Sequence, residues 1–210
     1  MERETILWNQ ASNKDKSYTT KLLDFFWYRN KQLKKSWRKE EVITFELLRA
    51  LEILPRDYFL RPLLAKIQQA APETQEVAKK LRAKTHEVEI HPFPNLHEKG
   101  NKRSDIGLAT PQATLWIEIK TNNKGSKNLP KQIQNQQEAL KKQTTNQQQA
   151  VIALLTPNYE YKGAQINWKD IKELLRNCEK KLETQDKKIV QGLTHIAKEL
   201  GDRIEEWFEK

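Results

Sequence analysis

Two acidic residues and one lysine are spaced as a metal-dependent hydrolytic site would require. Glu118 and Lys120 are separated by one residue in an apolar segment, and Asp105 precedes Glu118 by thirteen residues. Side chains at positions i and i+2 of a strand point to one face, so Glu118 and Lys120 would project together. Two carboxylates suit Mg²⁺ (or Mn²⁺), and an adjacent ammonium group can orient water or stabilise a charged transition state. These residue types predict phosphodiester hydrolysis.

The acid-x-Lys pattern alone is weakly specific. Its acidic positions are Glu118, Glu160, Asp170, Glu179 and Asp186. Only Glu118 lies in a strongly apolar segment, residues 115–120, and only Glu118 follows a hairpin that carries Asp105. The competing interpretation places Glu118 and Lys120 on a solvent-facing strand, paired across a sheet. A segment this apolar predicts a central strand, where polar residues need a reason.

Helix and strand signals around these residues predict an α/β (α+β) fold with a small mixed sheet flanked by helices. We expect helices over 18–37, 39–53, 61–81 with a break at Pro72, 130–142 and 168–182, and a final C-terminal helix. Strands are expected at 86–91, 105–109, 114–121 and 150–155. These elements predict one domain, with an N-terminal helical extension (1–38), a core (39–157) and C-terminal helices (158–210).

The last segment carries an apolar stripe with steps of three and four residues. Its members are Ile189, Leu193, Ile196, Leu200, Ile204 and Trp207. Such a stripe most often packs onto the protein's own core, and otherwise forms a homodimer or partner surface.

The chain has a net charge of +10, which favours an anionic partner such as nucleic acid. Residues 101–149 hold eight lysines and arginines against three acidic residues. We expect this segment to contact a phosphate backbone, of DNA first, with RNA not excluded. The candidate contact residues are Lys102, Arg103, Lys124, Lys127 and Lys131.

Other classes of protein are disfavoured. No apolar stretch approaches the roughly 20 residues of a membrane-spanning helix, and the N-terminus lacks signal-peptide features, so a cytoplasmic protein without a membrane partner is expected. The single cysteine, Cys178, excludes an internal disulfide framework and fits a buried apolar position. The histidine spacing matches no zinc helix.

The segments Ser104–Leu108 and Trp116–Thr121 resemble the two motif strands of the PD-(D/E)XK nuclease superfamily. Ser104 stands where the proline that gives the motif its name would be. The resemblance covers roughly residues 39–157, and residues 104–121 are its most specific part. It implies a restriction-endonuclease-like core with the order αβββαβ.

The same resemblance implies roles for individual residues. Asp105 and Glu118, with the backbone carbonyl of Ile119, would bind the metal, and Lys120 would activate or orient the attacking water. A glutamate of the first core helix would complete the site. Glu40 is favoured over Glu41 because Thr44 and Leu48 continue its face. A glutamine of the helix after the lysine, Gln132 or Gln136, would assist.

The sequence leaves four functional interpretations open. The first is a DNA endonuclease or exonuclease. The second is a structure-selective, junction-type nuclease that dimerises through the C-terminal stripe. The third is a nucleic-acid-binding module that keeps the fold without activity, and the presence of all the motif residues disfavours it. The fourth is a basic α+β domain in which the motif arose by chance.

Overall fold

The computed structural model describes residues 39–92, 104–121, 128–143, 147–155, 161–184 and 188–208. Side chains of residues 39–42, 188–192, 203 and 206–208 lie outside this description. The chain divides into two compact units, residues 1–42 and 43–210, and the sheet and its flanking helices belong to the second unit. The helix expected over 18–37 lies outside the described residues.

Six helices and five strands are described. The helices are α3 (Lys39–Ile53), α4 (Leu60–Ala70), α5 (Pro72–Ala83), α6 (Leu129–Gln143), α7 (Trp168–Glu183) and α8 (Lys188–Phe208), with a short 3₁₀ turn, η1 (Thr85–Glu87). The strands are β1 (Glu89–Pro92), β2 (Ile106–Thr110), β3 (Ala113–Ile119), β4 (Gln148–Leu155) and β5 (Gln165–Asn167).

The five strands form one mixed sheet in the order β1-β2-β3-β4-β5. The pairs β1/β2 and β2/β3 are antiparallel, as the tight connection between β2 and β3 requires. The pairs β3/β4 and β4/β5 are parallel, and α6 supplies the crossover between β3 and β4. The predicted α/β class, with a mixed sheet flanked by helices, is confirmed.

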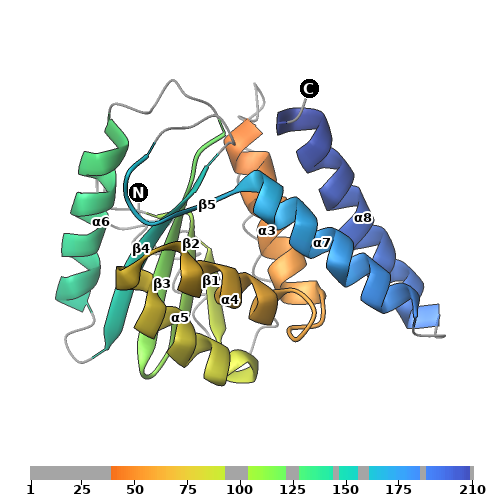
Figure 1. Cartoon of the computed structure of the whole chain (residues 1–210), viewed down its shortest axis with the longest axis horizontal. Helices are drawn as coiled ribbons and strands as arrows, with labels where there is room; N and C mark the ends of the chain where they lie inside the picture. Colours follow the sequence, from red (N-terminus) through yellow and green to blue (C-terminus); the bar gives the residue numbers. More distant parts are fainter. Residues whose placement is uncertain are drawn as a thin grey trace, which may run out of the picture. The chain divides into compact units, whose positions relative to one another are not determined.

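Strand β3 is central, and all seven of its residues are buried. Trp116 packs on one face with Leu129 and Ile133 of α6 and with Val151 of β4. Because side chains alternate along a strand, Leu115 and its i+2 neighbours point to the other face, which α5 covers. Figure 1 shows α4 and α5 lying across the strands, with α6 set apart from them.

Two helix boundaries follow from local chemistry. Pro72 occupies the first turn of α5, where its missing N–H is no loss, so the expected break separates α4 from α5. Helix α7 begins at Trp168 behind a capping box in which the side chains of Asn167 and Asp170 each accept from the other's backbone N–H.

The first and last strands differ from the sequence-based expectation. The expected strand at 86–91 begins only at Glu89, because residues 85–87 form η1. Arg56 holds this region by donating to the carbonyls of Thr85 and Val88, at 2.9 and 2.8 Å. Strand β5 was not predicted, since its three residues are too few to show an alternating pattern.

Helices α7 and α8 pack side by side (Figure 1). Leu200 and Ile204 of the predicted stripe are buried, whereas Leu193 and Ile196 are partly exposed. Cys178 of α7 is fully buried, and desolvation raises the pKa of its thiol to about 11, against a lowering by Lys181. Homodimerisation through the stripe stays a prediction. None of the helices in the described part of the chain is long and apolar enough to cross a membrane.

Candidate active site

Glu118 is an acidic residue near the end of β3, a strand in which every residue is buried. It is 2% exposed and lies one residue before the end of β3. Its position two residues after Trp116 directs it to the face of the sheet that α6 covers. Burying an ionised carboxylate is strongly unfavourable unless donors surround it. The partners of Glu118 therefore decide what this residue can do.

Three donors from two elements meet the Glu118 carboxylate. The ammonium Nζ of Lys120 donates to Oε1 at 2.5 Å, and the side-chain amide of Gln132 donates to the same oxygen. The amide Nε2 of Gln136 donates to Oε2 at 2.6 Å. Hydrogen bonds that involve an ionised partner are about twice as strong as neutral ones. These donors hold the carboxylate in one orientation at the end of β3.

The two glutamines come from one face of α6, because residues four positions apart in a helix are neighbours. Gln136 is fully buried and Gln132 is partly buried. The sequence predicted one or the other beside the acidic residues, and the structure brings both to Glu118. The Gln-rich sequence offered Gln136 only as one of two candidates, and the structure shows that it contacts Glu118.

Asp105 lies directly before β2 and is tied to the end of β3. Its backbone N–H donates to the carbonyl of Ile117 at 3.2 Å, and its Oδ2 accepts from the backbone N–H of Ile119 at 2.7 Å. The hydroxyl of Ser104 also donates to the Ile117 carbonyl, at 2.8 Å. The β2/β3 register ends with Ile106 opposite Ile117, and the bond from the Asp105 N–H to the same Ile117 carbonyl holds Asp105 beside the last residues of β3.

The donor set fits a hard cation such as Mg²⁺. The N–H and C=O of one residue in an extended strand point toward the same neighbouring strand, so the carbonyl of Ile119 is directed toward the side that Asp105 occupies. Two carboxylates and a carbonyl are oxygen ligands of the kind Mg²⁺ prefers, with water and substrate phosphate as the others. No group of three histidine, cysteine or acidic side chains suited to a metal occurs among the described residues.

Lys120 is held through its backbone as well as its side chain. Its N–H donates to the carbonyl of Leu154 at 2.9 Å, and its own carbonyl accepts from the indole Nε1 of Trp168 at 3.4 Å. Trp168 is fully buried at the start of α7. Sequence reasoning gave Trp168 no role at this site. Nothing in the sequence could have shown that a residue 48 positions away would reach the end of β3.

The remaining predicted site residues are placed only in part. Glu40 lies in the first turn of α3, and its side chain is outside the described part of the chain. Lys131 is exposed on α6, directly before Gln132. The other predicted nucleic-acid contacts, Lys102, Arg103, Lys124 and Lys127, lie outside the described residues.

Comparison of the chain with protein-family models, with curated proteins and with solved structures finds no match.

Proposed function

We propose that this protein is a Mg²⁺-dependent nuclease of the PD-(D/E)XK type, built on a restriction-endonuclease-like core. The observation that carries the proposal is the buried Glu118 carboxylate, in contact with Lys120 at the end of a central strand, where Asp105 accepts from the backbone N–H of Ile119. The order of elements around it supports the proposal, because α5, β1, β2, β3, α6 and β4 follow one another as an αβββαβ core would require.

The location of the charged cluster favours a catalytic role over a purely structural one. A buried ion pair is weak evidence for stability, because desolvation of the two charges offsets their attraction. The Lys120 side chain is 13% exposed, and the Glu118 side chain is 3% exposed. The pair therefore lies at the margin of the core, where a substrate phosphate can approach Lys120, rather than in its sealed centre.

Each residue has a defined task in this proposal. Asp105, Glu118 and the carbonyl of Ile119 would hold Mg²⁺, which when bound neutralises charge on the phosphate and lowers the pKa of water. The Nζ of Lys120 donates a hydrogen bond to the attacking water or to a phosphate oxygen. Gln132 and Gln136 keep the Glu118 carboxylate oriented by occupying lone pairs on both of its oxygens.

DNA is the proposed substrate. The net charge of +10 supports a polyanionic partner, and the basic residues of the 101–149 segment would hold the phosphodiester backbone. Exposed Lys131 lies next to Gln132 on α6, within the same element that supports Glu118. The proposed contacts are to the backbone, so recognition would depend on the structure of the DNA more than on its sequence.

Cleavage of a substrate panel tests the proposal. Supercoiled plasmid, linear duplex, single-stranded and branched DNA, and single-stranded RNA are incubated with the protein and Mg²⁺, with and without a chelator. We expect cleavage of at least one DNA substrate, lost with chelator and reduced at least about a hundredfold in Lys120→Ala. The matched control Lys180→Ala removes the same charge from an exposed position on α7 and should cleave normally.

Two outcomes would overturn the proposal. Equal cleavage rates for Lys120→Ala and the wild type would show that Lys120 takes no part in the chemistry. Binding of DNA without cleavage of any substrate would favour a nucleic-acid-binding module that keeps the fold.

A further inference from the structure

A basic hollow of about 570 Å³ lies between α4 and α5. Its charged lining consists of Asp57, Arg61, Lys79 and Arg82. Helix α5 covers the face of β3 and β4 opposite to the one that Glu118 and α6 share. The hollow is therefore a surface separate from the candidate active site, and the proposed nuclease activity does not use it.

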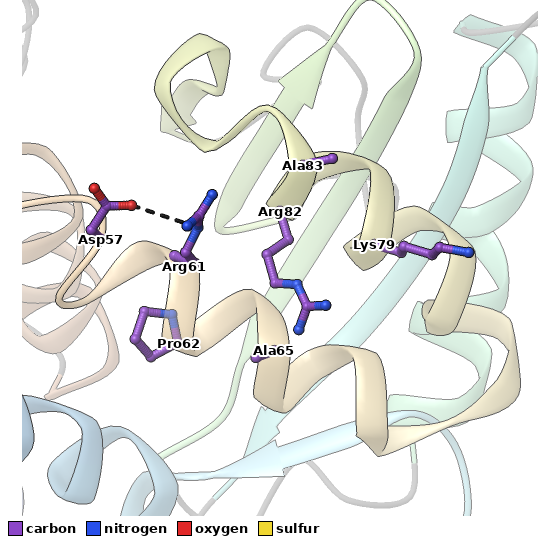
Figure 2. Close-up of a pocket in the computed structure, with 7 residues that line it drawn as sticks. All are labelled: Asp57, Arg61, Pro62, Ala65, Lys79, Arg82 and Ala83. Atoms are coloured by element: carbon purple, nitrogen blue, oxygen red, sulfur yellow. Dashed lines mark ion pairs between the residues drawn. The ribbon is translucent and has the colours of Figure 1, made fainter.

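Two arginines line the hollow from different helices. Figure 2 shows Arg82, from the last turn of α5, directed across the hollow toward Ala65 of α4, whereas Arg61, from the first turn of α4, lies beside Asp57. Lys79 of α5 also lines the hollow, and its side chain extends away from the two arginines. Pro62, Ala65 and Ala83 line the rest, and such short side chains leave the space unfilled.

The acidic residues around the hollow hold its cations only loosely. Nε of Arg61 lies 3.5 Å from Oδ1 of Asp57, whose other oxygen lies 3.7 Å from Nε2 of His86. Lys79 lies 3.7 Å from Glu76, and both side chains are about 60% exposed. Exposed ion pairs of this kind contribute about 0 to 1 kcal/mol. A stronger anion can therefore recruit Arg61 and Lys79 with little loss.

Arg82 has no such acidic neighbour. Its partly buried guanidinium makes no ion pair or hydrogen bond with any residue that the structure describes. The C-terminal turn of a helix favours a cation, which accounts for a basic residue at this position of α5. It does not account for Arg61, which lines the same hollow from the other helix. Two guanidinium groups that line one unfilled hollow repel each other, and an anion bound between them removes that repulsion.

We propose that this hollow binds a phosphate group between Arg61 and Arg82. A guanidinium presents its N–H donors as a planar fork that matches two phosphate oxygens, and Lys79 adds a point charge. Three cations against one lining carboxylate favour a doubly charged phosphate over a singly charged carboxylate. The ligand class is therefore a phosphate, carried either by a small phosphomonoester or by a nucleic-acid backbone.

Calorimetric titration with inorganic phosphate, at constant ionic strength and pH 8, tests the site. We expect wild-type protein to bind phosphate, with Arg82→Gln and Arg61→Gln each weakening the affinity about tenfold. Lys180→Gln, on α7, is the matched control and should leave the affinity unchanged. Asp57→Asn removes the lining carboxylate and should tighten binding about two- to threefold. This opposite change distinguishes a local site from general loss of fold, which thermal melting of each variant monitors.

The proposal is overturned if phosphate does not bind at up to about 10 mM. It is also overturned if Arg82→Gln binds as tightly as the wild type. The source of the phosphate is identified by comparing the binding of a short oligonucleotide that carries a 5′-phosphate with the binding of the same oligonucleotide without it. Preference for the phosphorylated form, lost in Arg82→Gln, supports a phosphomonoester ligand. Equal binding of both forms, also lost in Arg82→Gln, supports a backbone phosphate, whereas binding that Arg82→Gln leaves intact contradicts the site.

Discussion

Two glutamines of α6, Gln136 and Gln134, differ strongly in burial, and only Gln136 contacts Glu118. Gln136 is fully buried and donates to Oε2, whereas Gln134, two positions earlier in α6, is exposed and pairs loosely with Glu138 at 3.3 Å. Removing a donor from a buried charge leaves that charge less well solvated. The two glutamines of one helix thus offer a matched comparison.

Gln136→Ala should lower the free energy of unfolding by about 1 to 3 kcal/mol, because a buried carboxylate loses a hydrogen bond and a cavity remains. Gln134→Ala should change it by less than about 0.5 kcal/mol. Urea denaturation of both variants measures the difference. Equal stabilities for the two would mean that the contact between Gln136 and Glu118 does not support the fold.

Glu52, in the last turn of α3, gives a prediction about pH. Desolvation raises the pKa of its carboxyl from 4.5 to about 7, although the charge of Arg56 opposes the shift. The folded state thus holds this proton more tightly than the unfolded state. The resulting stabilisation is complete below pH 4.5 and is lost as the pH rises through 7.

Glu52→Gln, which stays neutral, should therefore be more stable than the wild type at pH 8 by about 2 kcal/mol, and nearly equal to it at about pH 4. Denaturation at both pH values checks this, with Glu183→Gln at an exposed position of α7 as the control. A Glu52→Gln variant with the same pH dependence as the wild type would contradict the raised pKa.

At the scale of elements, the hairpin β2/β3 and helix α6 carry the residues of the candidate site, and the first residue of α7 contacts the backbone just after β3. Trp168 begins α7 and donates to the carbonyl of Lys120, so the start of one helix fixes the end of the central strand. Trp116, in β3 itself, is a similarly buried indole that lies on the α6 side and has no bond to Lys120. Trp168 is accordingly a positioning residue in the proposed mechanism.

Trp168→Phe should lower kcat for DNA cleavage about tenfold while KM changes little, because it frees the backbone of the catalytic lysine. Trp116→Phe removes a comparable volume from the core without touching Lys120, and it should affect stability more than kcat. Steady-state kinetics and thermal melting of both variants separate the two roles. Similar kcat values for the two variants would show that the Trp168 contact has no positioning role.

Sequence patterns predicted these elements where they were long or sharply marked. The apolar run of β4, the break at Pro72 and the helical periods of α6 and α7 each follow from local chemistry, and the structure confirms them. Strand β5 was missing from the prediction, and the predicted start of β1, at residue 86, was wrong. Both depend on tertiary contacts, namely pairing with β4 and the hydrogen bonds from Arg56.

At the scale of the whole molecule, the sequence predicted the α/β class and the mixed sheet, but not the packing around β3. Acid-x-Lys recurs at Asp170 and Glu179 on α7; the apolar segment around Glu118 distinguished it from them in the sequence, and the structure adds that Glu118 is buried whereas Asp170 and Glu179 are half-buried. The burial of Glu118 at 2% and its contacts with Gln132 and Gln136 arise from the crossover of α6, which no local pattern encodes. The predicted homodimer and the basic DNA surface stay predictions.

The dependence of the DNA cleavage rate on Mg²⁺ concentration, measured for the wild type and for Asp105→Asn, tests the central claim most directly. Asp105→Asn keeps the size of the side chain and an oxygen that can accept from Ile119, but it removes the charge that would bind the metal. We expect a saturable Mg²⁺ dependence for the wild type and a rate at least about a hundredfold lower for Asp105→Asn. Cleavage by the wild type in the presence of chelator, or an Asp105→Asn rate within about twofold of the wild type, would contradict it.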